Sequence, residues 1–229
     1  MPNKPTIAVV IPAFNEAASI GKVVAEIPKT VARIVVADNA STDGTAAAAQ
    51  KAGALVVHEA QKGYGYACLK ALDFLSADPP DVVVFLDGDY SDYPEELSLL
   101  TDPIQEGTVD FVLGARYAQG REKGSLTPQQ QFGNALACTL MRWLYGSRFT
   151  DLGPFRAIRW DRLQQLQMVD KTYGWTVEMQ LKILRHQIPY REVNVRYKRR
   201  IGQSKVSGTV KGTIFAGVKI IGWIIKYYF

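Results

Sequence analysis

Two acidic residues that flank a glycine, Asp87-Gly88-Asp89, directly follow an apolar run at residues 82–86. The run is rich in β-branched residues, which is typical of a buried strand in a parallel sheet. Open α/β sheets bind ligands at the carboxyl ends of such strands. Two carboxylates there can share one Mg²⁺ or Mn²⁺ ion, and such ions usually carry phosphates, so the pattern favours a metal-bridged diphosphate of a nucleotide. The alternative is an acidic turn that only ends the strand.

Three further polar segments follow strand-like runs, at residues 11–16, 38–45 and 62–65. Asp38 ends the second run, where its carboxylate can accept hydrogen bonds from a base or a ribose. Lys62 is a candidate phosphate contact, and the glycines beside it allow the backbone to approach a ligand closely. Each segment alone is also compatible with ordinary capping of a helix.

Strands and helices alternate along the first half of the chain. Strands are predicted at residues 6–12, 33–37, 54–58, 82–86 and 109–113, and helices at residues 15–29, from a cap at 41–43 to about 52, at 63–75 and at 94–104. This alternation predicts an α/β fold with a mostly parallel central sheet flanked by helices. The polar segments then lie over one edge of that sheet.

The rhythm changes after Gly114. We predict a polar loop at residues 118–128, a helix at 129–144, a turn at 151–157, a helix at 175–186, a strand at 190–197 and a basic loop at 199–208. The sequence contains no linker and no internal repeat. We therefore expect one catalytic domain over residues 1–208, followed by a separate helix at residues 209–229.

The net charge of +5 conceals an asymmetry between the two halves of the chain. Residues 1–104 carry a net charge of −7, and residues 105–229 carry +12. A basic half suits phosphates, nucleic acid or an anionic membrane surface. Acidic strand ends and the lack of an interleaved aromatic and basic motif argue against nucleic acid.

The two cysteines, Cys68 and Cys138, are far apart and match no metal-binding or redox spacing. A strand-like segment begins by Thr6, where a secretory signal would otherwise be expected. We therefore expect a protein of the reducing cytoplasm.

The segment at residues 209–229 is nearly all apolar except for Lys211, Lys219 and Lys226. On a helix these lysines fall within about 80° of one another. A narrow basic stripe with nearby Trp and Tyr residues favours an interfacial helix that makes peripheral contact with a membrane. The alternatives are a helix that packs on the domain or on a second subunit, as in a homo-oligomer.

The four polar segments, read in order as IPAFNE, DNASTDGT, KGYG and DGD, resemble a GT-A glycosyltransferase of the family 2 type. The resemblance covers roughly residues 6–205. It implies that the first three segments line the nucleotide-sugar site and that the fourth holds Mg²⁺ or Mn²⁺. The residues so implied for the nucleotide sugar are Pro12, Phe14, Glu16, Asp38, Lys62, Gly63, Asp87 and Gly88, and those for the metal are Asp87 and Asp89.

Motifs in the second half resemble the dolichol-phosphate mannosyl- and glucosyltransferase branch. These are GARY at residues 114–117, Gly-Asn at 133–134, DLGPFRA at 151–157 and RRIGQSK at 199–205. The resemblance implies that Arg116 and Arg156 bind an acceptor phosphate. It also implies that the last loop closes over the donor diphosphate, through the residues Arg199, Ser204 and Lys205.

The implied reaction inverts the anomeric carbon in a single displacement. A lipid phosphate is already an anionic nucleophile, whereas a hydroxyl acceptor needs a base, for which Asp151 is the candidate. Asp151 also serves as the candidate for orienting the acceptor. Glu178 faces the sugar or pairs with Lys182, and Trp175 stacks on the sugar or belongs to the core. Ser91 stands where close relatives carry a longer ligand, so water and the diphosphate are expected to complete the metal shell.

We therefore expect a metal-dependent transferase that moves a hexose from a UDP- or GDP-sugar to a polyprenyl or dolichyl phosphate at the cytoplasmic membrane face. One alternative is a soluble family 2 enzyme that acts on a sugar or small-molecule hydroxyl. Another is a nucleotide-sugar-binding protein without catalysis.

Overall fold

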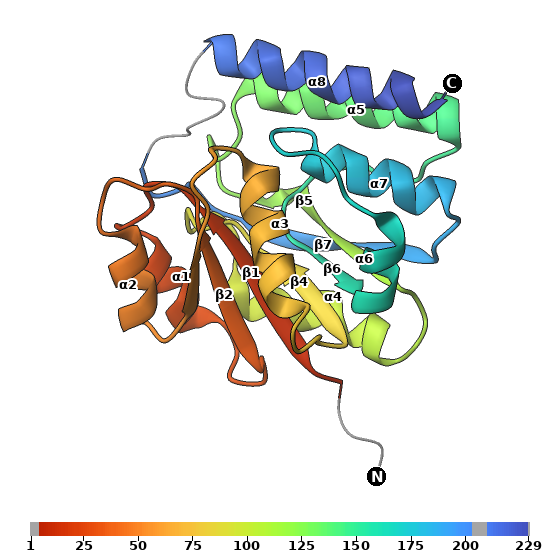
Figure 1. Cartoon of the computed structure of the whole chain (residues 1–229). Helices are drawn as coiled ribbons and strands as arrows, with labels where there is room; N and C mark the ends of the chain where they lie inside the picture. The colour runs from red at the N-terminus through yellow and green to blue at the C-terminus, as the bar shows by residue number, and fades with distance from the viewer. Residues whose placement is uncertain (1–4, 203–209, 229) are drawn as a thin grey trace.

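The computed structural model describes residues 5–202 and 210–228, with the side chains of the last helix described from Gly217 onward. In this part of the chain a seven-stranded sheet has the order β3-β2-β1-β4-β6-β5-β7 (Figure 1). Neighbouring strands are parallel except at β6, which is antiparallel to β4 and to β5. The predicted α/β fold with a mostly parallel sheet is therefore confirmed.

The bounds of the elements agree with the predicted alternation in the first half of the chain. The strands are β1 (Ile7–Ala13), β2 (Arg33–Asp38), β3 (Leu55–His58), β4 (Val82–Phe85), β5 (Phe111–Arg121), β6 (Arg156–Arg159) and β7 (Tyr190–Tyr197). The helices are α1 (Ile20–Glu26), α2 (Thr45–Lys51), α3 (Tyr64–Leu75), α4 (Leu97–Gln105), α5 (Pro128–Tyr145), α6 (Trp160–Leu166), α7 (Trp175–Arg185) and α8 (Val210–Tyr228). A single 3₁₀ turn, η1 (Pro94–Glu96), precedes α4.

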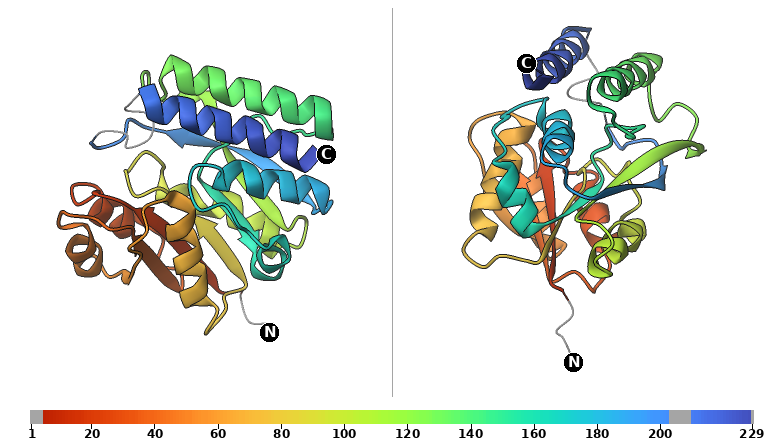
Figure 2. Two further views of the ribbon diagram at one scale, coloured as in Figure 1. Left: turned by 45° about the horizontal axis from the view of Figure 1, so that its top comes forward. Right: turned by 90° about the vertical axis from the view of Figure 1, so that its right-hand side faces the viewer.

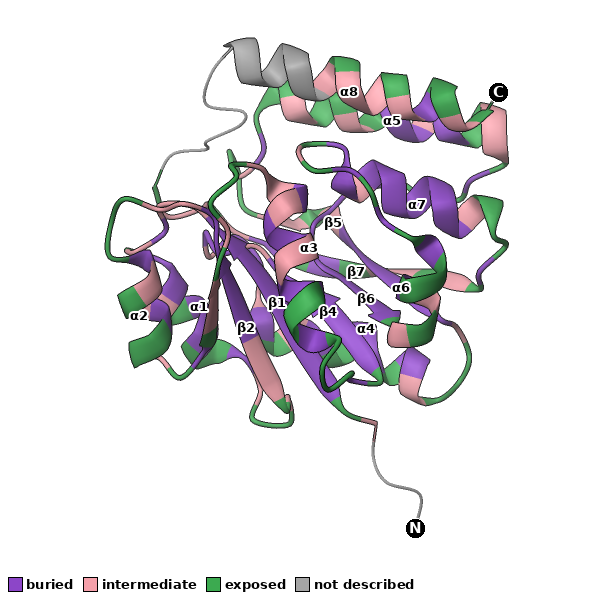
Figure 3. Cartoon of the chain, viewed as in Figure 1, coloured by how far each residue is buried: buried purple, intermediate pink, exposed green. Residues whose placement is uncertain are grey.

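Alternating side chains on the strands divide the core into two parts, one on each face of the sheet. Along β1, Ile7, Val9 and Ile11 pack with α1 and α4, whereas Ala8 and Val10 pack with α3 and α7. This follows from the two-residue period of a strand. Figure 3 shows that the central strands β1 and β4 and the inner faces of the helices are buried. The sheet is thus a rigid middle layer whose edge can hold a site.

The order of the strands creates a crevice above β1 and β4. From β1 the chain winds outward through β2 and β3, and it then crosses back to β4 on the other side of β1. Crossovers leave in opposite directions at this point, so the carboxyl ends of the two strands are not covered by a connection between them. The polar segments after β1 and β4 therefore face each other across the crevice.

The loop predicted at residues 118–128 is confined to residues 122–127, so the prediction is wrong at both ends. β5 continues to Arg121, which pairs with Tyr197 of β7. Thr127 and Gln130 then form a capping box that starts α5 at Pro128. The pairing with β7 supplies backbone hydrogen bonds that polar side chains in the sequence do not indicate.

Two other predicted boundaries are corrected. The helix expected at residues 15–29 begins only at Ile20, because Asn15 has φ of 54° and cannot belong to a helix. The turn expected at residues 151–157 includes the start of β6, a strand of four residues. β6 begins and ends with arginine, so it contains no apolar run from which a strand could be predicted.

α8 lies beside α5 and across α7 (Figures 1 and 2). The Tyr145 hydroxyl donates to the carbonyl of Ile224 at 2.5 Å, which joins α5 to α8. No helix in the described part of the chain is long and apolar enough to cross a membrane. α8 thus packs on the domain, which is one of the two alternatives for this segment, and its contact with a membrane or a second subunit stays a prediction.

Candidate active site

A cleft of about 300 Å³ opens at the carboxyl ends of β1 and β4. Eight residues predicted from the sequence line it together: Pro12, Phe14, Glu16, Lys62, Gly63, Asp87, Gly88 and Asp89. Residues that the prediction missed complete the wall: Ala13, Asn39, Tyr64, Ala67, Thr172, Tyr173 and Arg200. All four polar segments therefore meet around one cavity, the second of them through Asn39 alone.

The acidic pair occupies the base of the cleft. The Tyr64 hydroxyl donates to Asp87 Oδ1 at 3.1 Å, and the Ser91 amide donates to Asp89 Oδ1 at 2.9 Å. Removal from water, together with the negative charge of Asp89, raises the pKa of Asp87 to about 7. Two crowded carboxylates of this kind gain stability when a cation neutralises them.

The pair suits a hard divalent cation, although it provides only part of a coordination shell. Within residues 5–202 and 210–228 no group of three or more His, Cys, Asp or Glu side chains is arranged to hold a metal ion. Ser91 is fully buried and turns its hydroxyl to Asp89 Oδ1, so it braces a ligand instead of acting as one. A cation on Asp87 and Asp89 would therefore take its remaining ligands from water and from a diphosphate.

A third acid, Asp92, is buried behind the pair and is 2% exposed. Neither of its carboxylate oxygens has a hydrogen-bond partner among the described residues. Burial and the charges of Asp87 and Asp89 raise the pKa of Asp92 well above its usual range. Burial and these two charges therefore favour the neutral form of Asp92.

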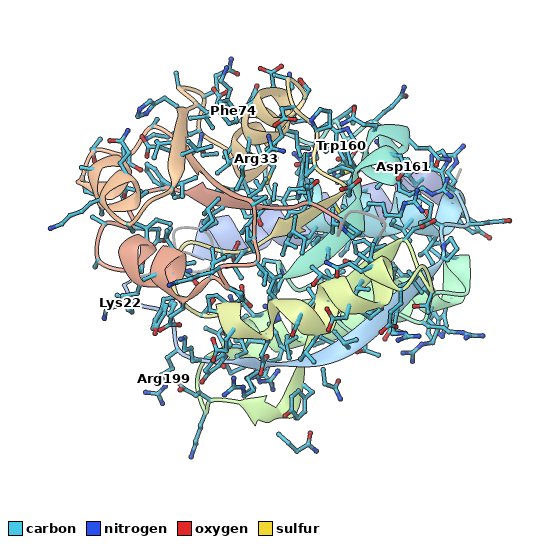
Figure 4. All side chains as sticks on the ribbon, turned by 90° about the horizontal axis from the view of Figure 1, so that it is seen from below. Lys22, Arg33, Phe74, Trp160, Asp161 and Arg199 are labelled. Carbon is cyan, nitrogen blue, oxygen red and sulfur yellow. The ribbon has the colours of Figure 1, made fainter. Side chains whose placement is uncertain are left out.

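Arg200 crosses the cleft and joins two of its acidic groups. Its Nη2 lies 3.0 Å from Glu16 Oε1, and its Nη1 lies 3.1 Å from Asp89 Oδ2. The sequence indicated a basic loop here but favoured the neighbouring Arg199. Arg199 is exposed, lies at the edge of the molecule (Figure 4) and donates from Nε to the carbonyl of Lys123 at 2.8 Å. Arg200 thus replaces Arg199 as the arginine of the cleft.

The other residues proposed for that loop, Ser204 and Lys205, lie outside the described residues. Their implied contact with a diphosphate therefore stays a prediction.

The turn at Lys62 and Gly63 is held by Asn39, which follows β2. The Asn39 side chain donates to the carbonyl of Gln61 at 2.6 Å and accepts from the amide of Gly63 at 2.7 Å. Lys62 Nζ lies 4.8 Å from the centre of the Phe14 ring. Asn39 belongs to a motif quoted from the sequence, but its function as a brace is visible only in three dimensions.

Asp38 lies at the same edge of the sheet but does not line the cleft. Its side chain is 8% exposed, and Oδ2 lies 3.1 Å from Nδ1 of His58. Its Oδ1 is buried without a hydrogen-bond partner among the described residues. An unsatisfied buried acceptor at a strand end is suited to a donor group from a ligand.

A second cavity of about 340 Å³ lies under α5 and contains Arg116, Arg121, Asn134 and Asp151. Arg116 and Asp151 form a two-point ion pair, with Nε to Oδ2 at 2.7 Å and Nη2 to Oδ1 at 2.6 Å. Burial alone would raise the pKa of Asp151, but the charge and hydrogen bonds of Arg116 lower it below its usual value. A carboxylate with a lowered pKa and both oxygens engaged is a poor general base. The structure therefore disfavours Asp151 as the base and Arg116 as a free phosphate ligand.

Arg156 does not reach either cavity. It is fully buried in β6, and its guanidinium donates to the carbonyls of Leu152, Gly153 and Thr176. Burial lowers its pKa to about 10. Its assignment to an acceptor phosphate is wrong, because these backbone carbonyls already occupy its donors.

Glu178 and Trp175 also belong to the scaffold. Glu178 is fully buried and lies 2.7 Å from Lys182 Nζ, which was the pairing alternative predicted from their spacing. Trp175 is 1% exposed and contacts the edge of Phe85 at 5.9 Å between ring centres. Neither side chain faces a sugar.

A doubly wound sheet whose crevice carries an acidic pair, a glycine-containing turn and an arginine defines a nucleotide-binding α/β protein. A family model described as glycosyl transferase family 2 matches residues 8–167. The chain belongs to this family, and its sheet has the GT-A arrangement.

Relatives of known name align over most of the chain. It is 31% identical over 220 residues to a dolichyl-phosphate hexose transferase of Haloferax volcanii. The alignment covers 94% of this chain and 90% of the relative. The chain is 29% identical over 233 residues to the polyprenol monophosphomannose synthase of Mycolicibacterium smegmatis, with 95% and 86% covered. Glycosyltransferase AglJ of Haloferax volcanii is 30% identical over 181 residues, which are 78% of this chain but only 58% of the relative.

Among solved structures, glucosyl-3-phosphoglycerate synthase from Mycobacterium tuberculosis in complex with Mn²⁺, UDP and phosphoglyceric acid superposes with a TM-score of 0.78. The identity is 22%, and 98% of this chain and 78% of that chain are covered. At this identity the likeness shows the fold alone.

Proposed function

We propose that this chain transfers a hexose from a nucleotide sugar to a polyprenyl phosphate, with inversion at the anomeric carbon. The observation that carries the proposal is the cleft at the β1–β4 edge, where Asp87 and Asp89 are crowded and Arg200 stands opposite them. The names of two relatives that align over nine-tenths of this chain support a lipid phosphate as the acceptor.

The side chains of the cleft have separate tasks in this reaction. Asp87 and Asp89 would hold Mg²⁺ or Mn²⁺, which offsets the charge that develops on the departing diphosphate. Tyr64 and Ser91 keep the two carboxylates oriented through their hydrogen bonds. Arg200 is near enough to exchange its carboxylate partners for a phosphate oxygen of the donor.

The bond change is a single displacement. An oxygen of the acceptor phosphate attacks the anomeric carbon, the bond from that carbon to the diphosphate breaks, and the electron pair leaves with the nucleoside diphosphate. A phosphate monoester is already anionic at neutral pH, so no side chain has to remove a proton. This agrees with the engagement of Asp151 by Arg116.

A surface layer of α5 and α8 supports a membrane-bound acceptor. Apolar side chains are exposed along both helices, which lie side by side (Figure 2). They are Phe132, Leu136 and Trp143 on α5 and Val218, Ile225 and Tyr228 on α8. We propose that this layer rests on the cytoplasmic face of a membrane, with Lys226 near anionic headgroups.

The test is a transfer assay with UDP- and GDP-hexoses, Mg²⁺ or Mn²⁺, and polyprenyl phosphate in vesicles. We expect a lipid-linked hexose with one of the donors and no product after chelation of the metal. A parallel arm offers 3-phosphoglycerate and simple sugars in place of the lipid. Product only in that arm would overturn the lipid acceptor, and donor binding without transfer in any arm would leave a binding protein without catalysis.

A further inference from the structure

One wall of the cleft comes from a turn far from the strand ends. Thr172 and Tyr173 line the cleft, although they lie between α6 and α7. The turn needs support of its own, because a strand does not hold it in place. Part of that support comes from a buried acid, Asp170.

The Asp170 carboxylate is fully buried and divides its two oxygens between two tasks. Oδ1 accepts from the amides of Thr172 at 2.7 Å and Gly174 at 3.0 Å, and so shapes the turn. Oδ2 accepts from Trp223 Nε1 at 2.7 Å and pairs with Lys219 Nζ at 2.8 Å. Both of these partners belong to α8, so one carboxylate ties the C-terminal helix to the wall of the cleft.

Gly174 leaves space for this contact. A Cβ atom at position 174 would lie 2.3 Å from Trp223 Nε1 and 2.5 Å from Asp170 Oδ2. The backbone of Gly174 has φ of −87°, which any residue adopts, so the glycine is required by the approach of the indole and not by the chain conformation. The indole of Trp223 therefore packs so closely on the backbone of Gly174 that no side chain fits between them.

The turn also touches the opposite wall of the cleft. The carbonyl of Lys171 accepts from the amide of Tyr66 at 3.1 Å. A Cβ atom on Gly65 would lie 2.0 Å from the carbonyl oxygen of Asp170, and one on Gly63 would lie 2.2 Å from that of Lys171. Backbone packs on backbone here, so a shift of the turn would displace the glycine loop that follows Lys62.

We propose that α8 is a positioning element for the donor site, acting through Trp223 and Lys219 on Asp170. The inference rests on the proposed function in one respect, namely that the cleft binds the nucleotide sugar. Lys219 Nζ also donates to the hydroxyl of Thr172, a lining residue of the cleft, whereas Trp223 acts through Asp170. They act by fixing the turn that carries Thr172 and Tyr173, and a helix outside the catalytic layers thereby sets donor affinity.

Two variants of the full chain test this in different ways. Trp223→Phe removes the indole N–H and keeps an aromatic ring, whereas Gly174→Ala keeps every polar group and displaces the indole. Gly222→Ala is the matched control, because a Cβ there meets nothing within 4 Å. Binding of UDP and of GDP with Mn²⁺ is measured by calorimetry, at a temperature well below the Tm of each variant.

We expect both test variants to bind the nucleotide about 5-fold more weakly, as the loss of one buried hydrogen bond would do. The control should stay within about 2-fold. In the transfer assay the donor KM should rise with little change in kcat or in acceptor KM. The double variant should be hardly worse than either single variant, because both changes disturb one contact.

Two results would overturn the proposal separately. If the wild-type chain binds nucleotide and the test variants bind it equally while their Tm falls, then α8 is only a structural support and the proposed function is untouched. If the wild-type chain binds neither nucleotide, then the proposed function fails and this inference fails with it.

Discussion

Two cavities of this molecule, one at the β1–β4 edge and one under α5, contain charged residues in opposite states. At the β1–β4 edge Asp87 and Asp89 crowd each other, and the pKa of Asp87 rises to about 7. Under α5, Arg116 and Asp151 neutralise each other, and the pKa of Asp151 falls. The first site is electrostatically incomplete and gains from a cationic ligand, whereas the second is complete by itself. This difference explains why the β1–β4 cleft is the better candidate for catalysis, whereas the Arg116–Asp151 pair is better suited to stabilising the fold.

The largest expected effect is on transfer activity, after a change in the β1–β4 cleft, the electrostatically incomplete site. Asp89→Asn removes one of two metal-binding carboxylates and should lower kcat/KM at least about 1000-fold, because charge on the leaving diphosphate is no longer stabilised. The measurement is hexose transfer at saturating Mn²⁺, with Asp161→Asn as an exposed acid remote from the cleft. Activity within tenfold of wild type would remove the metal assignment.

Disruption of the Arg116–Asp151 pair, the electrostatically complete site, should mainly lower the free energy of unfolding. Asp151→Asn leaves the Arg116 charge buried without its partner and should lower the free energy of unfolding by about 3 kcal/mol. Chemical denaturation measures this change. The double variant with Arg116→Met should recover part of the loss, since no unpaired charge remains. A variant that stays stable and loses a pH-dependent step in transfer would instead make Asp151 a base.

Arg200 links the two kinds of behaviour, because it is a protein cation that pairs with Asp89, the proposed metal ligand. Arg200→Gln should weaken nucleotide binding about 20-fold through loss of a charged hydrogen bond. The same variant should bind Mn²⁺ more tightly when nucleotide is absent, since no guanidinium competes for Asp89. Arg199→Gln, one residue away and exposed, should change neither constant by more than about 2-fold. Equal effects at both arginines would refute the assignment of Arg200.

The smallest expected effect is on how the free energy of unfolding of the metal-free chain depends on pH. The pKa of Asp87 is about 7 in the folded chain and about 4 when unfolded. The folded state therefore binds more protons between these values, so the free energy of unfolding falls as the pH rises from about 4 to about 7, and this contribution is constant above that range. Asp87→Asn should flatten the decline in urea titrations with chelator present. An unchanged slope in the variant would show that Asp87 ionises normally.

The sequence could predict that the residues of the β1–β4 cleft lie together because of how parallel strands are arranged. Residues at the carboxyl ends of β1, β2, β3 and β4 meet at one edge, so their order along the chain gives their neighbourhood in space. Pro12, Lys62 and Asp89 could be placed together on that ground.

The remaining site residues had no comparable signal. Arg156 is the charged first residue of β6, whose sequence RAIR contains no apolar run, so its burial could not be deduced from the sequence pattern. Arg199 and Arg200 are adjacent in a basic run, and only the fold separates the exposed one from the one in the cleft. The contact of Asp170 with Trp223 joins residues 53 positions apart, with no pattern that connects them.

The contacts of Asp170 with both the cleft wall and α8 also have a consequence for how long the enzyme stays on a membrane. If the contact with α8 raises donor affinity, thermodynamic reciprocity requires the bound donor to hold α8 more firmly by the same factor. Should the outer face of α8 rest on lipid, the loaded and empty forms would differ in how long they remain there. Residence at the membrane would then report whether the donor occupies the cleft.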